Sequence, residues 1–135
     1  MGDTSVSVLV VEDDRNIREF ICEALRGEGL QVVEAGDGEE AVKCAGDRRP
    51  GAIVLDIGLP LLDGAAVADR IRDMYPDPVP VIVVTAGRHP DLSRIRASAE
   101  FTKPFDLDDL VAAVRQAVAP PPGAAERREP STAES

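Results

Sequence analysis

The chain has 135 residues, a formal net charge of −10 and 44% hydrophobic residues, but only 3% aromatic residues. This length and composition predict one globular domain with an aliphatic core of Val, Ile, Leu and Ala. The acidic balance argues against a nucleic-acid partner bound through a basic face. It fits a solvated surface and, in part, an acidic pocket that attracts cations.

The two cysteines are isolated thiols, Cys22 and Cys44, in helix-like segments. They make neither a disulfide framework nor a metal-binding spacing, so a reducing compartment is expected. No segment has the length of a membrane span, and the N-terminus lacks the pattern of a signal peptide. We therefore expect a cytoplasmic protein with no membrane association.

Short apolar runs alternate along the chain with amphipathic segments, which is the pattern of repeated βα units. Strands are predicted over residues 6–11, 30–34, 52–56, 79–85 and 99–102. The third and fourth runs are almost continuously apolar, which is typical of strands buried on both faces of a parallel sheet.

Apolar residues at helical spacing predict helices after the first, second, third and fifth strands. The first helix begins after Asp14 and the last after Asp106, and both aspartates are placed to cap their helices. The second helix ends before Arg49-Pro50-Gly51, and the third is stopped by Pro76. Residues 94–98 have a poor pattern, so the helix after the fourth strand should be short or irregular.

These elements predict an α/β domain over residues 1–119. Right-handed crossovers that cover both faces of the sheet lead to the strand order 2-1-3-4-5, a flavodoxin-like, doubly wound, five-stranded parallel sheet. Residues 120–135, PPPGAAERREPSTAES, lack apolar periodicity and are expected to be a disordered, Pro-rich tail.

Four strands end in residues that suit phosphoryl chemistry, and parallel strands bring these ends to one edge of the sheet. The strand ends carry Glu12-Asp13, Asp56, Thr85 and Lys103. Clustered carboxylates repel one another unless a cation lies among them, and Mg²⁺ prefers a few such oxygens together with a phosphate oxygen. A carboxylate aimed at phosphorus can act as a nucleophile and form an acyl phosphate.

Each of these residues also has an ordinary structural interpretation. Acids after a strand often cap the next helix, Thr85 suits a buried strand, and Lys103 suits a solvated surface. Capping fits Asp56 poorly because the next helix starts several residues later, after Pro60. The ordered set of four strand ends is more specific than any member alone.

The segments VLVVEDDRNIRE, VLDIGLPLLDG, VIVVTA and FTKPFD resemble the receiver domain of bacterial response regulators, and the resemblance covers about residues 6–118. It implies phosphoryl transfer from a histidine kinase or a histidine phosphotransfer protein, and a cis peptide before Pro104. The implied site comprises the phosphoacceptor Asp56, the Mg²⁺ ligands Glu12, Asp13, Asp56 and the Gly58 carbonyl, the switch hydroxyl of Thr85 and the phosphoryl-contacting Lys103.

Three features depart from the family pattern. Glu100 stands where the family often has Tyr or Phe, and strand parity sends Phe101 to the opposite face. Phe101 is therefore predicted to be a core residue, and aromatic switching to be absent or altered. The segment between the fourth and fifth strands is about one helical turn shorter than usual. Gly58 and Gly87 offer no side chain to orient water, so the common pocket is predicted to set the lifetime of the phosphoryl group.

The resulting prediction is a stand-alone receiver, not an enzyme, that switches binding to a downstream protein and is a monomer or weak dimer. Two alternatives stay open: a receiver-like interaction module that phosphorylation does not regulate, and a receiver cut from a longer multidomain regulator. An aspartate-nucleophile phosphatase commonly has a second acid two residues after the nucleophile, where this chain has Gly58. A flavin carrier has a phosphate loop after the first strand, where this chain has acids.

Overall fold

The computed structural model describes residues 7–56, 64–85 and 97–118. Its five strands form one parallel sheet in the order β2-β1-β3-β4-β5, as the sequence predicts. The strands are β1 (Ser7–Val11), β2 (Gln31–Ala35), β3 (Ala52–Asp56), β4 (Val81–Thr85) and β5 (Ala99–Thr102). Every residue of β1, β3 and β4 is buried, which explains the continuous apolar runs.

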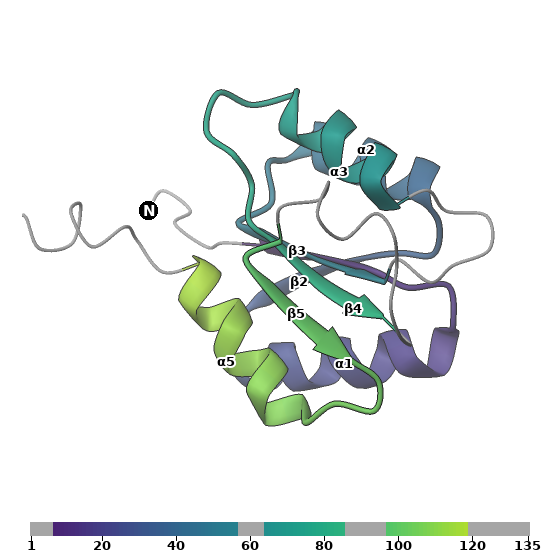
Figure 1. Ribbon diagram of the computed structural model, residues 1–135, viewed down its shortest axis with the longest axis vertical. Coiled ribbons are helices and arrows are strands. Elements are labelled where there is room, and N and C mark those ends of the chain that lie inside the picture. The colour runs from purple at the N-terminus through teal and green to yellow at the C-terminus, as the bar shows by residue number, and fades with distance from the viewer. Residues whose placement is uncertain (1–6, 57–63, 86–96, 119–135) are drawn as a thin grey trace, which may run out of the picture.

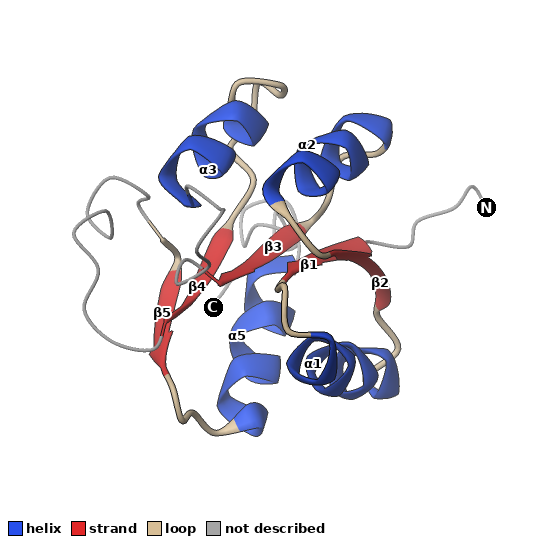
Figure 2. Cartoon of the chain, turned by 90° about the vertical axis from the view of Figure 1, so that its right-hand side faces the viewer, coloured by secondary structure: helices blue, strands red, loops and turns tan. Residues whose placement is uncertain are grey.

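Helices cover both faces of the sheet (Figures 1 and 2). α1 (Arg15–Gly27) and α5 (Leu107–Val118) lie on one face, and α2 (Gly38–Asp47) and α3 (Gly64–Arg72) lie on the other. Alternate residues of the inner strands supply the two layers of core, so Val54 packs towards α1 and α5 while Ile53 and Leu55 pack towards α2 and α3. The sheet therefore lies between two layers of helices, because strands alternate along the chain with amphipathic helices.

Helix starts are fixed by aspartates at the carboxyl edge of the sheet. The Asp14 carboxylate accepts hydrogen bonds from the backbone N–H groups of Asn16 and Ile17 at 2.9 and 3.1 Å. Asp37 caps α2 in the same way, and Asp106 accepts from the N–H of Asp108 at 2.8 Å. The predicted caps Asp14 and Asp106 are therefore confirmed, and they hold the loops that carry the acidic residues.

Several sequence predictions fall outside the described residues. These are Gly58 as a Mg²⁺ ligand, the role of Gly87, most of the irregular fourth helix at 94–98, and the tail at 120–135. Within the described ranges, no helix is both long enough and apolar enough to cross a membrane.

Candidate functional site

Three charged or polar side chains are buried where neighbouring strands end. Glu12 is 2% exposed, Asp56 is 4% exposed and Thr85 is 4% exposed. The strand register explains their proximity, since Val11 pairs with Leu55 and Asp56 pairs with Val84. Burial of ionisable groups is costly unless they are paired, so this edge of the sheet is a candidate functional site.

Lys103 lies between the two buried carboxylates. Its Nζ atom is 2.8 Å from Asp56 Oδ2 and 3.5 Å from Glu12 Oε1, and its side chain is 26% exposed. Its backbone N–H also donates to the Thr85 carbonyl at 2.7 Å, which ties the residue after β5 to the end of β4. The structure thus joins Glu12, Asp56, Thr85 and Lys103 at one edge.

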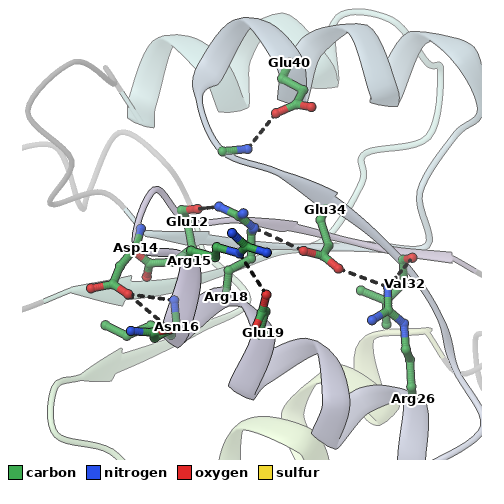
Figure 3. A network of polar contacts seen from close by, with 12 residues as sticks. Glu12, Asp14, Arg15, Asn16, Arg18, Glu19, Arg26, Val32, Glu34 and Glu40 are labelled. Carbon is green, nitrogen blue, oxygen red and sulfur yellow. Dashed lines mark hydrogen bonds and ion pairs between the residues drawn. The ribbon is translucent and has the colours of Figure 1, made fainter.

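Hydrogen bonds hold Glu12 through both its side chain and its backbone (Figure 3). Its Oε2 atom accepts a hydrogen bond from the Asp14 N–H at 3.1 Å, and its own N–H donates to the Ala35 carbonyl at 3.1 Å. Oε1 is buried and makes no hydrogen bond to any described residue. A buried carboxylate oxygen with unused acceptor capacity is well suited to a cation.

Burial and neighbouring charges shift the pKa values of the site. Burial raises the pKa of Glu12 to about 7, and the adjacent Asp56 carboxyl adds to the rise. Burial alone would lower the pKa of Lys103, but its hydrogen bond to Asp56 and the charges of both acids raise it above the ordinary value. Lys103 therefore stays an ammonium ion, and the two carboxylates compete for its charge.

Asp13 is placed differently from its neighbour. Its side chain is exposed, because consecutive residues at the end of a strand point in opposite directions. In the described part of the chain, no three acidic, histidine or cysteine side chains form a group that could hold a metal ion. Glu12 and Asp56 are thus buried together at this edge, whereas Asp13 is exposed.

The described residues of β5 bear on one predicted departure from the family pattern, at Glu100 and Phe101. Phe101 is half-buried on the α1 and α5 face, where it packs beside Phe105 with ring centroids 6.2 Å apart. Glu100, one residue earlier, is exposed. Phe101 therefore packs against the core as predicted, although it is only partly buried. The peptide bond between Lys103 and Pro104 is cis, as the resemblance implies.

Arg18 is a residue that the sequence analysis missed. Its Nη1 atom donates to the Glu12 carbonyl at 2.8 Å, and its Nε atom lies 3.1 Å from Glu34 Oε1. The sequence does carry a signal for Arg18. A cation close to the N-terminus of a helix opposes the helix dipole, so it needs an acceptor nearby.

The sheet order and the buried acidic residues at the carboxyl edge are typical of a receiver domain. The chain matches the family model of the response regulator receiver domain over residues 8–115, and it belongs to this family.

Relatives with curated functions are full-length regulators. The chain is 43% identical over 118 residues to the transcriptional regulatory protein PrrA of Mycobacterium tuberculosis, covering 84% of this chain and 50% of that protein. It is 40% identical over 116 residues to the transcriptional regulatory protein PdtaR of Mycobacterium tuberculosis, covering 82% of this chain and 56% of that one. The chain thus spans about half the length of these relatives.

Solved structures agree with this assignment. The response regulator TrrA of Thermotoga maritima, in complex with Mg²⁺ and BeF, is 36% identical with a TM-score of 0.73, covering 83% of this chain and 98% of that one. The chemotaxis protein CheY4 of Vibrio cholerae is 25% identical with a TM-score of 0.74, covering 84% and 98%. The chain therefore has the fold of a two-component response regulator receiver. Receiver domains are signalling domains.

Proposed function

We propose that Asp56 accepts a phosphoryl group from a histidine kinase or a histidine phosphotransfer protein, and that this switches binding to a downstream protein. The observation that carries the proposal is the contact of 2.8 Å between Lys103 Nζ and the buried Asp56 Oδ2, with Glu12 alongside. An ammonium ion in this position neutralises charge that gathers on a phosphoryl group.

In the proposed transfer, an Asp56 carboxylate oxygen forms a bond to phosphorus as the bond between phosphorus and the donor histidine nitrogen breaks. The electron pair of the broken bond stays with the imidazole. Lys103 neutralises charge on the phosphoryl oxygens. The Thr85 hydroxyl donates a hydrogen bond to one of these oxygens in the phosphorylated form. The buried setting limits access of water to the acyl phosphate.

The residues fit a magnesium ion. The buried Glu12 Oε1 makes no hydrogen bond to a described residue, and the Asp56 carboxylate lies beside it. We propose that Glu12, Asp13, Asp56 and the Gly58 carbonyl hold Mg²⁺, which when bound supplies positive charge to the phosphoryl oxygens. The Mg²⁺ complex of TrrA supports this assignment.

Mass spectrometry tests the proposal directly. The protein is incubated with Mg²⁺ and acetyl phosphate, and its intact mass is compared with that of Asp56→Asn. One added phosphoryl group in the parent alone is the expected result.

A second arm of the experiment uses a panel of phosphorylated histidine kinases as donors. No adduct from any donor would contradict the proposal and favour an interaction module that phosphorylation does not regulate. The family's role in signalling would remain, but Asp56 would not be its chemical centre.

A further inference from the structure

We propose that Arg18 is a positioning residue, which orients the Glu12-Asp13 turn towards the metal and phosphoryl site. This inference rests on the proposed function, because it assigns Arg18 a part in building the same pocket. Arg18 contacts the backbone carbonyl of Glu12 and the side chain of Glu34. It acts through the backbone of Glu12.

The Arg18 guanidinium bridges two elements with one rigid group (Figure 3). Nη1 donates to the Glu12 carbonyl at 2.8 Å, while Nε contacts Glu34 Oε1 on β2 at 3.1 Å. The Arg18 side chain is only 18% exposed. A planar guanidinium fixes the direction of both partners, which a flexible ammonium ion cannot do.

Glu34 is itself held by a second arginine. Arg26 Nη2 lies 3.2 Å from Glu34 Oε2 and 3.4 Å from the Val32 carbonyl. The Arg18 hydrogen bond, opposed by partial burial and assisted by Arg26, lowers the pKa of Glu34 below its usual range. Glu34 is therefore a fixed anion, and it anchors the Arg18 side chain to the edge strand.

The opposite side of the Glu12 peptide is also restrained. The Glu12 N–H donates to the Ala35 carbonyl at 3.1 Å, and Oε2 accepts from the Asp14 N–H at 3.1 Å. With the Arg18 contact to its carbonyl, three separate bonds fix the residue. They leave Oε1 as the atom directed to Lys103, at 3.5 Å.

The space around the Arg18 guanidinium is limited as well. A Cβ atom built on Gly36 would lie 3.4 Å from Arg18 Nη1 and 3.7 Å from Glu40 Oε1. Glu40 Oε1 accepts from the Gly36 N–H at 2.8 Å, so this turn is itself tied to α2. The Arg18 guanidinium thus lies between the end of β1 and the end of β2, where a small shift would move the Glu12 carbonyl.

Arg26 provides a matched control. Arg18→Gln and Arg26→Gln each remove one cation from Glu34, but only Arg18→Gln removes the bond to the Glu12 carbonyl. We expect Arg18→Gln to raise the dissociation constant for Mg²⁺ about tenfold, as measured by titration calorimetry, since loss of an outer-sphere partner weakens metal binding on this scale. Arg26→Gln should change it less than about twofold, while both variants lower the thermal midpoint in EDTA by a similar ~5 °C.

Arg18→Lys separates charge from geometry. It keeps the positive charge but cannot reach both partners in the same arrangement, so we expect the dissociation constant to rise about fivefold, less than for complete loss of the outer-sphere partner. Wild-type affinity in Arg18→Lys, or equal losses in Arg18→Gln and Arg26→Gln, would overturn the positioning role.

A readout without metal keeps this inference distinct from the proposed function. Amide hydrogen exchange reports the Asp14 N–H, which is bonded to Glu12 Oε2. We expect Arg18→Gln to accelerate its exchange at least ~10-fold in EDTA and Arg26→Gln to leave it near the parent rate, because only the first frees the Glu12 turn. If the parent bound no Mg²⁺ but this selective acceleration occurred, the metal assignment would fail and the positioning of Glu12 by Arg18 would stand. Equal exchange in both variants would overturn the positioning role.

Discussion

The two edges of the sheet pair their polar groups in different ways. At the amino edge, the Tyr75 hydroxyl donates to the Ala45 carbonyl, and Arg49 donates to the carbonyls of Asp77 and Pro78 at 3.2 and 3.3 Å. The Arg49 guanidinium also lies over the Tyr75 ring. These contacts pair donors with neutral acceptors and close the loops that precede β3 and β4.

At the carboxyl edge, two buried carboxylates share one ammonium ion, and one carboxylate oxygen makes no hydrogen bond to a described residue. Such an arrangement costs free energy in the folded state, whereas the pairs at the amino edge stabilise it. This contrast agrees with the proposal that the carboxyl edge binds a ligand, while the contacts at the amino edge stabilise the fold. Each of the following predictions tests one side of this contrast.

Removal of the shared ammonium ion should have the largest effect. Lys103→Met is expected to slow phosphorylation by acetyl phosphate about 10²–10³-fold, because charge on the transferred group is no longer neutralised. The rate is measured by intact mass at saturating Mg²⁺. Lys43→Met, at an exposed position on α2, should phosphorylate at the parent rate. Equal rates for the parent and Lys103→Met would remove the lysine from the mechanism.

The ionisation of Glu12 should make the metal-free protein less stable at higher pH. The pKa of Glu12 is about 4.5 in the unfolded chain and about 7 in the folded protein. Between these values the unfolded state loses the proton first, so the stabilising contribution is present below pH 4.5 and is lost as pH rises through 7. The free energy of unfolding should fall by about 3 kcal/mol over this range.

Denaturant titrations in EDTA from pH 4.5 to 8 measure this dependence. Glu12→Gln is the control, because it has no proton to lose and should show a smaller fall. Identical pH profiles for the parent and Glu12→Gln would show that ionisation of Glu12 does not destabilise the folded protein.

Magnesium should offset the free-energy cost of the buried, ionised carboxylates. At a concentration 100 times the dissociation constant, Mg²⁺ is expected to raise the free energy of unfolding by about 2.7 kcal/mol. At one fixed Mg²⁺ concentration, this gain in unfolding free energy should be larger at pH 8 than at pH 5, because a protonated carboxyl at Glu12 is a poor ligand. Thermal unfolding with and without Mg²⁺ measures it, and Asp13→Asn tests whether the exposed Asp13 contributes. No gain at pH 8 would contradict the proposed ligand set.

The amino edge should respond in stability alone. Tyr75→Phe removes the hydroxyl that bonds the Ala45 carbonyl and should cost about 1 kcal/mol of unfolding free energy. Its rate of phosphorylation and its gain from Mg²⁺ should equal those of the parent. A slower reaction in Tyr75→Phe would mean that the two edges are linked, and the contrast between them would not hold.

Much of the fold follows from local patterns. The apolar runs predicted the strands to within two residues, and Asp14 and Asp106 marked the starts of their helices, because each signal lies within one element or at its end. The third helix ends at Arg72, earlier than its predicted stop at Pro76. Crossover handedness then led to the strand order, and the strand ends placed Glu12, Asp56 and Lys103 at one edge. This part of the site was predictable because parallel strands share a direction.

The tertiary structure decided which atoms meet at that edge. Lys103 and Asp56 are 47 positions apart in the chain, and Arg18 meets Glu34 across 16 positions, so no local pattern specifies either contact. Packing also turned Glu12 inwards and left Asp13 exposed, although the sequence presents them as a pair. The raised pKa of Glu12 follows from that burial. The sequence by itself determined the sheet and the chemical types at its edge, while distances, burial and ionisation depended on how the helices and strands pack.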